Sequence, residues 1–138
     1  MSGADVFLDT SVVLYLLSAD ARKADRAEAL LAAGGAISVQ VLNEFAAVAH
    51  RKSALSWPEV RETLSVIRAA CITHPLTEEV HDRGVDIAER YGFSVYDSTI
   101  VAAAQVAGCR TLFSEDLQHA QVIDRALTVR NPFIGSAN

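Results

Sequence analysis

The sequence predicts an α/β fold, with helices on both faces of a short and mainly parallel sheet. Short apolar segments alternate with longer segments of helical composition along the chain, and strands that are separated by helices usually pair in parallel. The length of 138 residues suits one domain with its own core. Hydrophobic residues make up 51% of the chain and charged residues only 21%, which argues against disorder.

The charge balance limits the class of protein. Lys and Arg total 12 against 17 Asp and Glu, and a net charge of −5 is not the basic balance of a typical nucleic-acid-binding protein, although a local basic surface can coexist with it. The first apolar segment has no basic region before it and no stretch is long enough to span a membrane, so we expect neither a signal peptide nor a membrane protein. Cys71 and Cys109 lack metal or redox spacing, so we expect reduced thiols in a cytoplasmic protein.

The first predicted element is the strand Val6-Phe7-Leu8, which runs into Asp9. This pattern is typical of a buried strand whose polar end emerges at one edge of a sheet. Ser11 is predicted to cap the apolar helix that follows over residues 12–17. Because ligands of open parallel sheets bind beyond the carboxyl ends of the strands, Asp9 is a candidate functional residue.

The remaining elements alternate in the same way. Gly34 ends one predicted helix, and Ser56 with Glu59 forms the pattern of a capping box at the start of another. Thr77 precedes two glutamates that suit a first helical turn, and Ser94 opens the last long helix. Helices are predicted over residues 22–33, 40–51, 56–70, 77–91 and 94–106, and strands over 36–38, 71–73, 111–113 and 127–129.

Four acidic residues stand out from this pattern. The neighbours of Glu44 at one helical turn are apolar, and so are those of Asp97. Asp116 follows the strand over 111–113, as Asp9 follows the first strand. Carboxylates on apolar stripes are costly unless something positive meets them. If the four converge, they form a pocket of hard oxygen ligands, which suits Mg²⁺ or Mn²⁺ rather than Zn²⁺.

Each acid also has a purely structural interpretation. Asp9 can cap the helix that follows it, and Asp97 suits a first helical turn, where the helix dipole stabilises a negative charge. Glu44 can pair with an arginine. Asp116 can cap a short helix over residues 117–123. Any one acid can be structural, but a structural role for all four is harder to accept.

Four short motifs in a fixed order resemble those of PIN-domain ribonucleases, and especially the VapC-like toxins of bacterial and archaeal toxin–antitoxin pairs. The matching segments are Phe7-Leu8-Asp9-Thr10-Ser11, Asn43-Glu44-Phe45, Tyr96-Asp97-Ser98 and Ser114-Glu115-Asp116-Leu117-Gln118-His119. Each motif is weak alone, but the ordered set is specific and spans nearly the whole chain, including Asn131-Pro132-Phe133. Ala120 departs from the pattern, because close relatives often carry glycine after the histidine, and this difference affects a turn more than the chemistry.

The resemblance implies a PIN-like three-layer α/β/α sandwich, with residues 1–138 as a single PIN domain, and Mg²⁺- or Mn²⁺-dependent cleavage of RNA. It also implies a homodimer and a small cognate antitoxin that covers the acidic pocket. By matching position, the residues that bind the metal and carry catalysis are Asp9, Glu44, Asp97 and Asp116. Ser11 or Ser98 would support these acids or position a water molecule.

Metal-assisted hydrolysis of RNA gives each acid an expected role. Asp9 and Asp97 are the expected principal ligands, Glu44 positions the attacking water or acts as base, and Asp116 completes the site through water or a second ion. Residues expected to bind the RNA backbone are Arg22, Lys23, Arg26, Arg51 and Lys52, although these side chains also suit ordinary solvated helix faces.

Three other classes of protein fit the sequence less well. A phosphatase with an aspartyl nucleophile needs a second aspartate two positions after Asp9, where the chain has Ser11. A phosphoacceptor receiver domain needs a lysine after a late strand, and both lysines, Lys23 and Lys52, come early. The third alternative is a catalytically inactive PIN-like module that only binds RNA or protein. The complete set of four acids argues against it.

Overall fold

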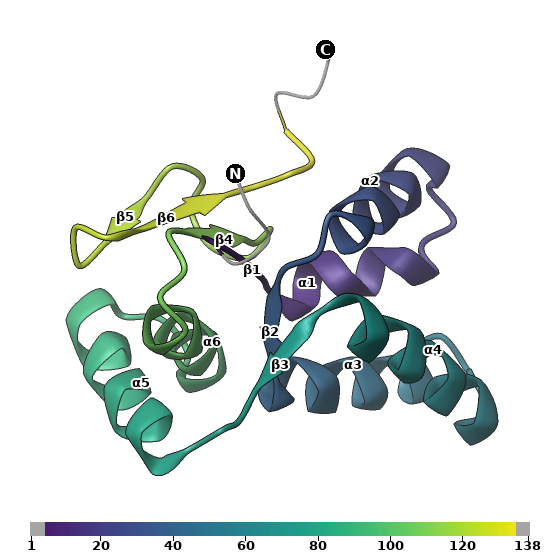
Figure 1. Ribbon diagram of the computed structural model, residues 1–138, viewed down its shortest axis with the longest axis horizontal. Coiled ribbons are helices and arrows are strands. Elements are labelled where there is room, and N and C mark those ends of the chain that lie inside the picture. Colours follow the sequence, from purple (N-terminus) through teal and green to yellow (C-terminus); the bar gives the residue numbers. More distant parts are fainter. Residues whose placement is uncertain (1–4, 135–138) are drawn as a thin grey trace.

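The structure is a computed structural model that describes residues 5–134 (Figure 1). The helices are α1 (Thr10–Val13), the 3₁₀ helix η2 (Leu14–Leu17), α2 (Ala21–Ala32), α3 (Val39–Arg51), α4 (Trp57–Ala70), α5 (Glu78–Tyr91) and α6 (Val95–Val106). The strands are β1 (Val6–Leu8), β2 (Ala36–Ser38), β3 (Ile72–His74), β4 (Thr111–Phe113), β5 (Val122–Ile123) and β6 (Leu127–Arg130).

The six strands form one sheet in the order β3-β2-β1-β4-β6-β5. Every pair is parallel except β5 with β6, which is antiparallel. Helices α1 to α4 lie on one side of the sheet and α5 and α6 on the other (Figure 1). The predicted three-layer α/β/α architecture with a mainly parallel sheet is therefore confirmed. Its centre is β1, which lies between β2 and β4.

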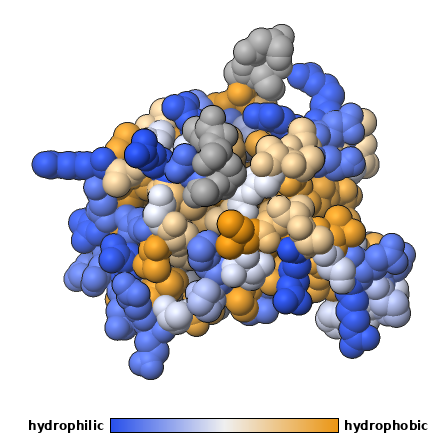
Figure 2. Space-filling model, viewed as in Figure 1, coloured by the Kyte–Doolittle hydropathy of each residue, from blue (hydrophilic) through white to orange (hydrophobic). Residues whose placement is uncertain are grey.

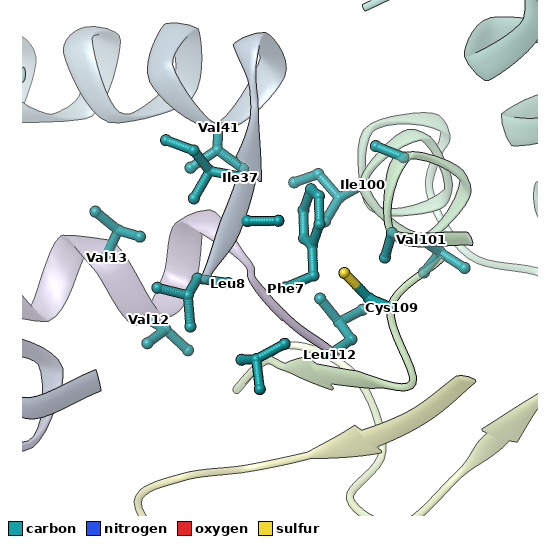
Figure 3. Close-up of a cluster of buried hydrophobic side chains, with 14 of the residues drawn as sticks. Phe7, Leu8, Val12, Val13, Ile37, Val41, Ile100, Val101, Cys109 and Leu112 are labelled. Atoms are coloured by element: carbon teal, nitrogen blue, oxygen red, sulfur yellow. The ribbon is translucent and has the colours of Figure 1, made fainter. Parts of the chain in front are cut away.

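The core is built on both faces of β1. Phe7 and Leu8 have no exposed surface, and because successive strand residues point to opposite faces, they enter different layers. Figure 3 shows Phe7 pointing toward Ile100 of α6, and Leu8 pointing toward Val12 of α1. A strand this short is stabilised by burial on both sides rather than by its own length. The same burial fixes where the chain leaves the sheet at Asp9.

Several helix ends follow the predicted signals. The capping box at the start of α4 is confirmed, because the Ser56 hydroxyl accepts from the Glu59 amide and the Glu59 carboxylate accepts from the Ser56 amide. Ser94 accepts from the backbone of the first turn of α6 in the same way. Gly92 ends α5 with φ of 76°, a left-handed conformation that favours glycine.

Two predictions about caps are wrong. Ser11 does not cap the first helix, because it lies inside α1, and Asp9 occupies the N-cap position without a side-chain capping bond. Residues 117–123 do not form a helix for Asp116 to cap. They form a turn and the short strand β5, which pairs with β6. An antiparallel strand of two residues is too short for its sequence pattern to be read.

None of the helices within residues 5–134 is both long and apolar enough to cross a lipid bilayer. On the face seen in Figure 2, hydrophilic side chains project at the margins and apolar side chains are visible between them.

Candidate functional site

The carboxyl ends of β1 and β4 lie side by side, because Leu8 is in register with Phe113. Asp9 follows the first of these strands, and Ser114 follows the second. The Asp9 carboxylate is 3% exposed, and its Oδ2 accepts hydrogen bonds from the hydroxyls of Ser11, at 2.8 Å, and Ser114, at 2.7 Å. Within residues 5–134, Oδ1 of Asp9 accepts no hydrogen bond. One carboxylate oxygen is thus held by the protein and the other is left for a ligand.

Burial raises the pKa of Asp9 from 3.8 to about 7, although the hydrogen bonds from Ser114 and Ser11 act in the opposite direction. The negative charges of Asp116 and Asp97 raise it further. A buried carboxyl group that is surrounded by other carboxylates and lacks a positive partner is unstable in its charged form. This is the electrostatic pattern of a site that needs a cation.

Glu44 projects from α3 and is held at both oxygens. Its Oε1 accepts from the hydroxyl of Thr10 at 2.7 Å, and its Oε2 accepts from the side-chain amide of Gln40 at 2.6 Å. No arginine or lysine of the described residues forms an ion pair with Glu44, so the alternative in which it pairs with an arginine is wrong. Two neutral donors fix this carboxylate without neutralising it.

Asp97 and Asp116 complete the acidic group. Asp97 lies in the first turn of α6, where its amide donates to the Ser94 hydroxyl at 3.1 Å, and burial followed by the charge of Glu44 raises its pKa. The pKa of Asp116 is also raised, first by partial burial and then by the charges of Asp97, Glu115 and Glu44. Each of the four acids therefore lies within electrostatic range of at least two others. The structure brings all four to one region of the molecule.

The donor chemistry of this region fits a hard divalent cation. The four acids supply oxygen ligands only, and the buried hydroxyl of Ser98, next to Asp97, has no hydrogen-bond partner among the described residues. Within residues 5–134, no three acidic, histidine or cysteine side chains are already placed to hold one ion. Mg²⁺ does not require such a cage, because it keeps several water ligands and binds through one or two carboxylates.

An open groove of about 890 Å³ runs beside these acids and is lined directly by Glu44 and Asp116. Thr10 and Ser11 of α1 also line it, as does Tyr96, the residue before Asp97. Arg51 and Lys52, at the end of α3, line the same groove. Arg51 and Lys52 therefore share one depression in the surface with two of the four acids, and Asp9 and Asp97 do not line it.

The other three predicted basic residues lie differently. Lys23 donates to Glu115, at 3.3 Å, and to the Tyr15 hydroxyl, at 3.1 Å. Arg26 donates to the backbone oxygen of Pro132 at 3.2 Å. Arg22 is exposed in the first turn of α2 and does not line the groove. Of the five basic residues, only Arg51 and Lys52 line the groove, and neither forms an ion pair with another described residue.

Sequence reasoning missed Ser114. Its hydroxyl has no exposed surface, donates to Asp9, and accepts from the amides of Asp116 and Leu117, at 3.1 and 3.4 Å. One side chain therefore holds the first acid and the turn that carries the last one. The available signal was its position directly after a strand, the same signal that identified Asp9.

Two solved structures resemble this chain over most of its length. VapC20 from Mycobacterium tuberculosis, described as a Sarcin-Ricin loop cleaving toxin, is 21% identical with a TM-score of 0.65, covering 80% of this chain and 91% of that chain. A toxin–antitoxin complex from Klebsiella pneumoniae is 19% identical with a TM-score of 0.71, covering 93% of this chain and 98% of that chain. At these identities the likeness shows the fold.

A comparison with curated proteins finds no significant match in sequence. A comparison with protein families matches residues 6–124 to the PIN domain. The matched segment contains all four acids, both strands that carry Asp9 and Ser114, and every helix of the sandwich. The chain therefore belongs to the PIN domain family, and its fold is the one found in VapC toxins.

Proposed function

We propose that the protein is a metal-dependent ribonuclease that hydrolyses phosphodiester bonds of RNA at the acidic groove, and that it is the toxin of a toxin–antitoxin pair. The observation that carries the proposal is the convergence of four acids, with Asp9 buried among them, and no ion pair to any of the four from the described residues. Membership of the PIN domain family supports it. The similarity in fold to VapC20, a Sarcin-Ricin loop cleaving toxin, is consistent with it.

Asp9 and Asp97 would hold the cation, which is Mg²⁺ or Mn²⁺, and Asp116 would complete the site. A bound divalent cation supplies positive charge for the phosphate and for the leaving oxygen. Glu44, held by Thr10 and Gln40 at both oxygens, lines the groove and would orient the attacking water or take its proton. Its two hydrogen bonds fix the carboxylate before RNA binds.

The remaining roles fall to polar and basic side chains. Ser11 and Ser114 hold Oδ2 of Asp9 and so set the direction of its other oxygen. The unpartnered hydroxyl of Ser98 would hold a water molecule beside Asp97. Arg51 and Lys52 would bind the phosphates of the RNA strand in the groove, where electrostatic attraction supplies affinity without sequence preference.

We also propose that the protein acts in the cytoplasm, forms a homodimer and is inhibited by a small antitoxin. The Klebsiella pneumoniae structure is a complex of toxin and antitoxin. The groove of this chain offers apolar contact surface at Leu14 and Leu17 beside the acids. An arginine of the antitoxin is the expected inhibitory group, because a guanidinium pairs with carboxylates in a bidentate geometry.

Cleavage of RNA by the purified protein tests the proposal. Structured RNA should be cut in Mg²⁺ or Mn²⁺ and remain intact in excess chelator, and Asp97→Asn should be inactive in either buffer. The matched control is Asp82→Asn, which changes an exposed aspartate of α5 away from the groove. Cleavage that continues in chelator and is unaffected by Asp97→Asn would overturn the mechanism.

The alternative function is a catalytically inactive module that binds RNA or protein. The same assay separates the two functions. An inactive module cuts RNA neither in chelator nor in Mg²⁺.

A further inference from the structure

A pair of stacked aromatic rings joins the end of α3 to the start of α4. His50 is in the last turn of α3, and Trp57 is the first residue of α4. The two ring centroids are 3.9 Å apart and the ring planes differ by 18°. His50 lies beside Arg51 and one helical turn beyond Ala47, and both of those residues line the groove. Neither ring lines the groove, but the stacked pair is next in the chain to the basic residues that do.

Both rings are held in place by the backbone around them. Nδ1 of His50 lies 2.9 Å from the backbone oxygen of Leu55. A carbonyl only accepts, so the imidazole proton sits on Nδ1. The capping box of Ser56 and Glu59 fixes the first turn of α4 and with it the backbone of Trp57. One face of the indole thus rests on a ring that is itself tethered.

The rest of the indole is open to solvent. Trp57 is 52% exposed, and among the described residues its ring nitrogen donates to no acceptor. A ring that is already ordered loses little entropy when a second ring stacks on it. The open face and the unused donor are features of a binding surface.

The charges nearby indicate what binds. Arg51 and Lys52 are both exposed, and neither forms an ion pair with another described residue. From Glu44 to Arg51 the helix axis rises by about 10 Å, and His50 comes directly before Arg51, so the two cations and the stacked rings lie at the same end of α3. A partner that fits Arg51, Lys52 and Trp57 has negative charges for the two cations and a flat ring for the indole. A strand of RNA has both.

We propose that Trp57, supported by His50, is a stacking platform for an unpaired base of the RNA substrate. The inference rests on the proposed function and deepens it. The strand runs along Arg51 and Lys52 into the groove, and the base stacked on Trp57 lies on one side of the cleaved bond. Aromatic side chains bind unstacked bases in this way, whereas bases inside a duplex are not accessible to them. The substrate is therefore single-stranded or looped where it crosses α3.

The tryptophan itself reports on the proposed contact, because the chain contains one Trp. Protein that carries Asp97→Asn is titrated in chelator with a single-stranded oligoadenylate and, separately, with a blunt-ended duplex of the same length. The single strand should quench the fluorescence of Trp57 in a saturable manner, and the duplex should leave it unchanged. Equal quenching by both, or RNA binding without quenching, would overturn the proposal.

Substitutions at the platform test its contribution to cleavage. Trp57→Ala should raise KM for a single-stranded substrate about tenfold, since stacking of this kind is commonly worth a factor of that size. It should leave kcat unchanged, and Trp57→Phe should restore most of the loss. Val66→Ala, at an exposed apolar residue of the same helix, is the matched control. An unchanged KM for Trp57→Ala in an active enzyme overturns the platform and leaves the ribonuclease function standing.

The two proposals fail in distinguishable ways. Quenching by single-stranded RNA without any cleavage would remove the ribonuclease function and retain the platform. If Trp57→Ala leaves RNA binding unchanged but weakens self-association in sedimentation, the exposed indole serves a protein interface and the RNA platform is wrong. Thermal melting of each variant shows whether the fold is intact, and Trp57→Phe retains the ring if Trp57→Ala fails to fold.

Discussion

The hydroxyl of Ser114 donates a hydrogen bond of 2.7 Å to Oδ2 of Asp9, and so joins two residues that are 105 positions apart in the chain. The bond is buried and links the ends of the two central strands. It also ties the first acid to the turn that carries Asp116, whose amide donates to the same hydroxyl. The geometry of the acidic site therefore depends on this serine.

Ser114→Ala should destabilise the protein and impair the site together. Removing the hydroxyl leaves Asp9 with one hydrogen bond fewer in a buried position, which costs roughly 1–3 kcal/mol of unfolding free energy. Cleavage should fall as well, because Asp9 and Asp116 are both released. Urea denaturation and an RNA cleavage assay measure the two effects. Ser65→Ala, at an exposed serine of α4, should change neither, and a Ser114→Ala variant that matches wild type in both assays contradicts the assigned role.

Without metal, the protein should lose stability as pH rises from about 4 to about 7. The pKa of Asp9 rises from its ordinary value of 3.8, which applies to the unfolded chain, to about 7 in the folded protein. The folded state thus binds the proton more tightly in this window, and the stability present at low pH is lost as the group ionises. The full loss is roughly 4 kcal/mol. Asp9→Asn should remove most of this pH dependence, and denaturation at pH 5 and pH 8 in chelator measures it. An equal change in unfolding free energy between pH 5 and pH 8 for the wild type and Asp9→Asn would contradict the prediction.

Replacing one of the four acids by its amide should not lower the melting temperature of the metal-free protein. In chelator, Asp97→Asn should melt at or above the wild-type temperature, because it removes a repelling charge from the group. Millimolar Mg²⁺ should then stabilise the wild type by mass action and the variant much less. Thermal melts in the two buffers measure both effects. If every amide variant loses stability equally with and without Mg²⁺, the acids have a structural role only.

Lys52 and Lys23 should contribute differently to RNA binding. Lys52 is unpaired among the described residues and lines the groove, whereas Lys23 is paired with Glu115 at 3.3 Å. Lys52→Gln should therefore reduce the salt dependence of binding to single-stranded RNA by about 0.7 in the log–log slope, the value for one phosphate contact. Lys23→Gln should leave the slope unchanged. Fluorescence anisotropy at several salt concentrations measures both, and a reduced slope for Lys23→Gln would show that the ion pair opens to RNA.

Ala120→Gly should stabilise the protein. Ala120 has φ of 71°, a left-handed conformation, which costs a residue with a Cβ roughly 1–2 kcal/mol. Glycine avoids this cost, but it loses more chain entropy on folding, which offsets roughly 0.5–1 kcal/mol of the gain in stability. Gly108→Ala is the reverse experiment, because Gly108 has φ of 77° and its Cβ would meet no atom within 4 Å. Chemical denaturation should show that Ala120→Gly raises the free energy of unfolding and that Gly108→Ala lowers it. If both changes shift it in the same direction, something other than φ controls the stability of these turns.

The sequence predicted the elements whose signals are local. The capping box of Ser56 and Glu59, the glycine that follows α2 at Gly34 and the buried strand before Asp9 each depend on a few neighbouring residues. The position of Asp97 in the first turn of α6 followed in the same way. Signals of this kind are present in a single sequence because the physics that produces them acts over one turn of helix or one strand.

The features that the sequence did not reveal depend on residues far apart in the chain. Ser11 was predicted to be a cap, but its hydroxyl donates to Asp9 because Asp9 is drawn into the sheet edge by β4. The pairing of Lys23 with Glu115 joins residues 92 positions apart. The two-residue strand β5 exists only because β6 lies beside it. No local pattern encodes such partners.

The central place of β1 in the sheet has a consequence for protein synthesis. Strand β1 leaves the ribosome before both of its neighbours, and one of them, β4, ends at residue 113. Chains emerge at about 5–20 residues per second. Until Ser114 and Asp116 have emerged, Asp9 lacks the hydroxyl of Ser114 that holds it, and the fourth acid has not joined the site. For the proposed ribonuclease, the acidic site therefore stays incomplete on a nascent chain until the segment after β4 has left the ribosome.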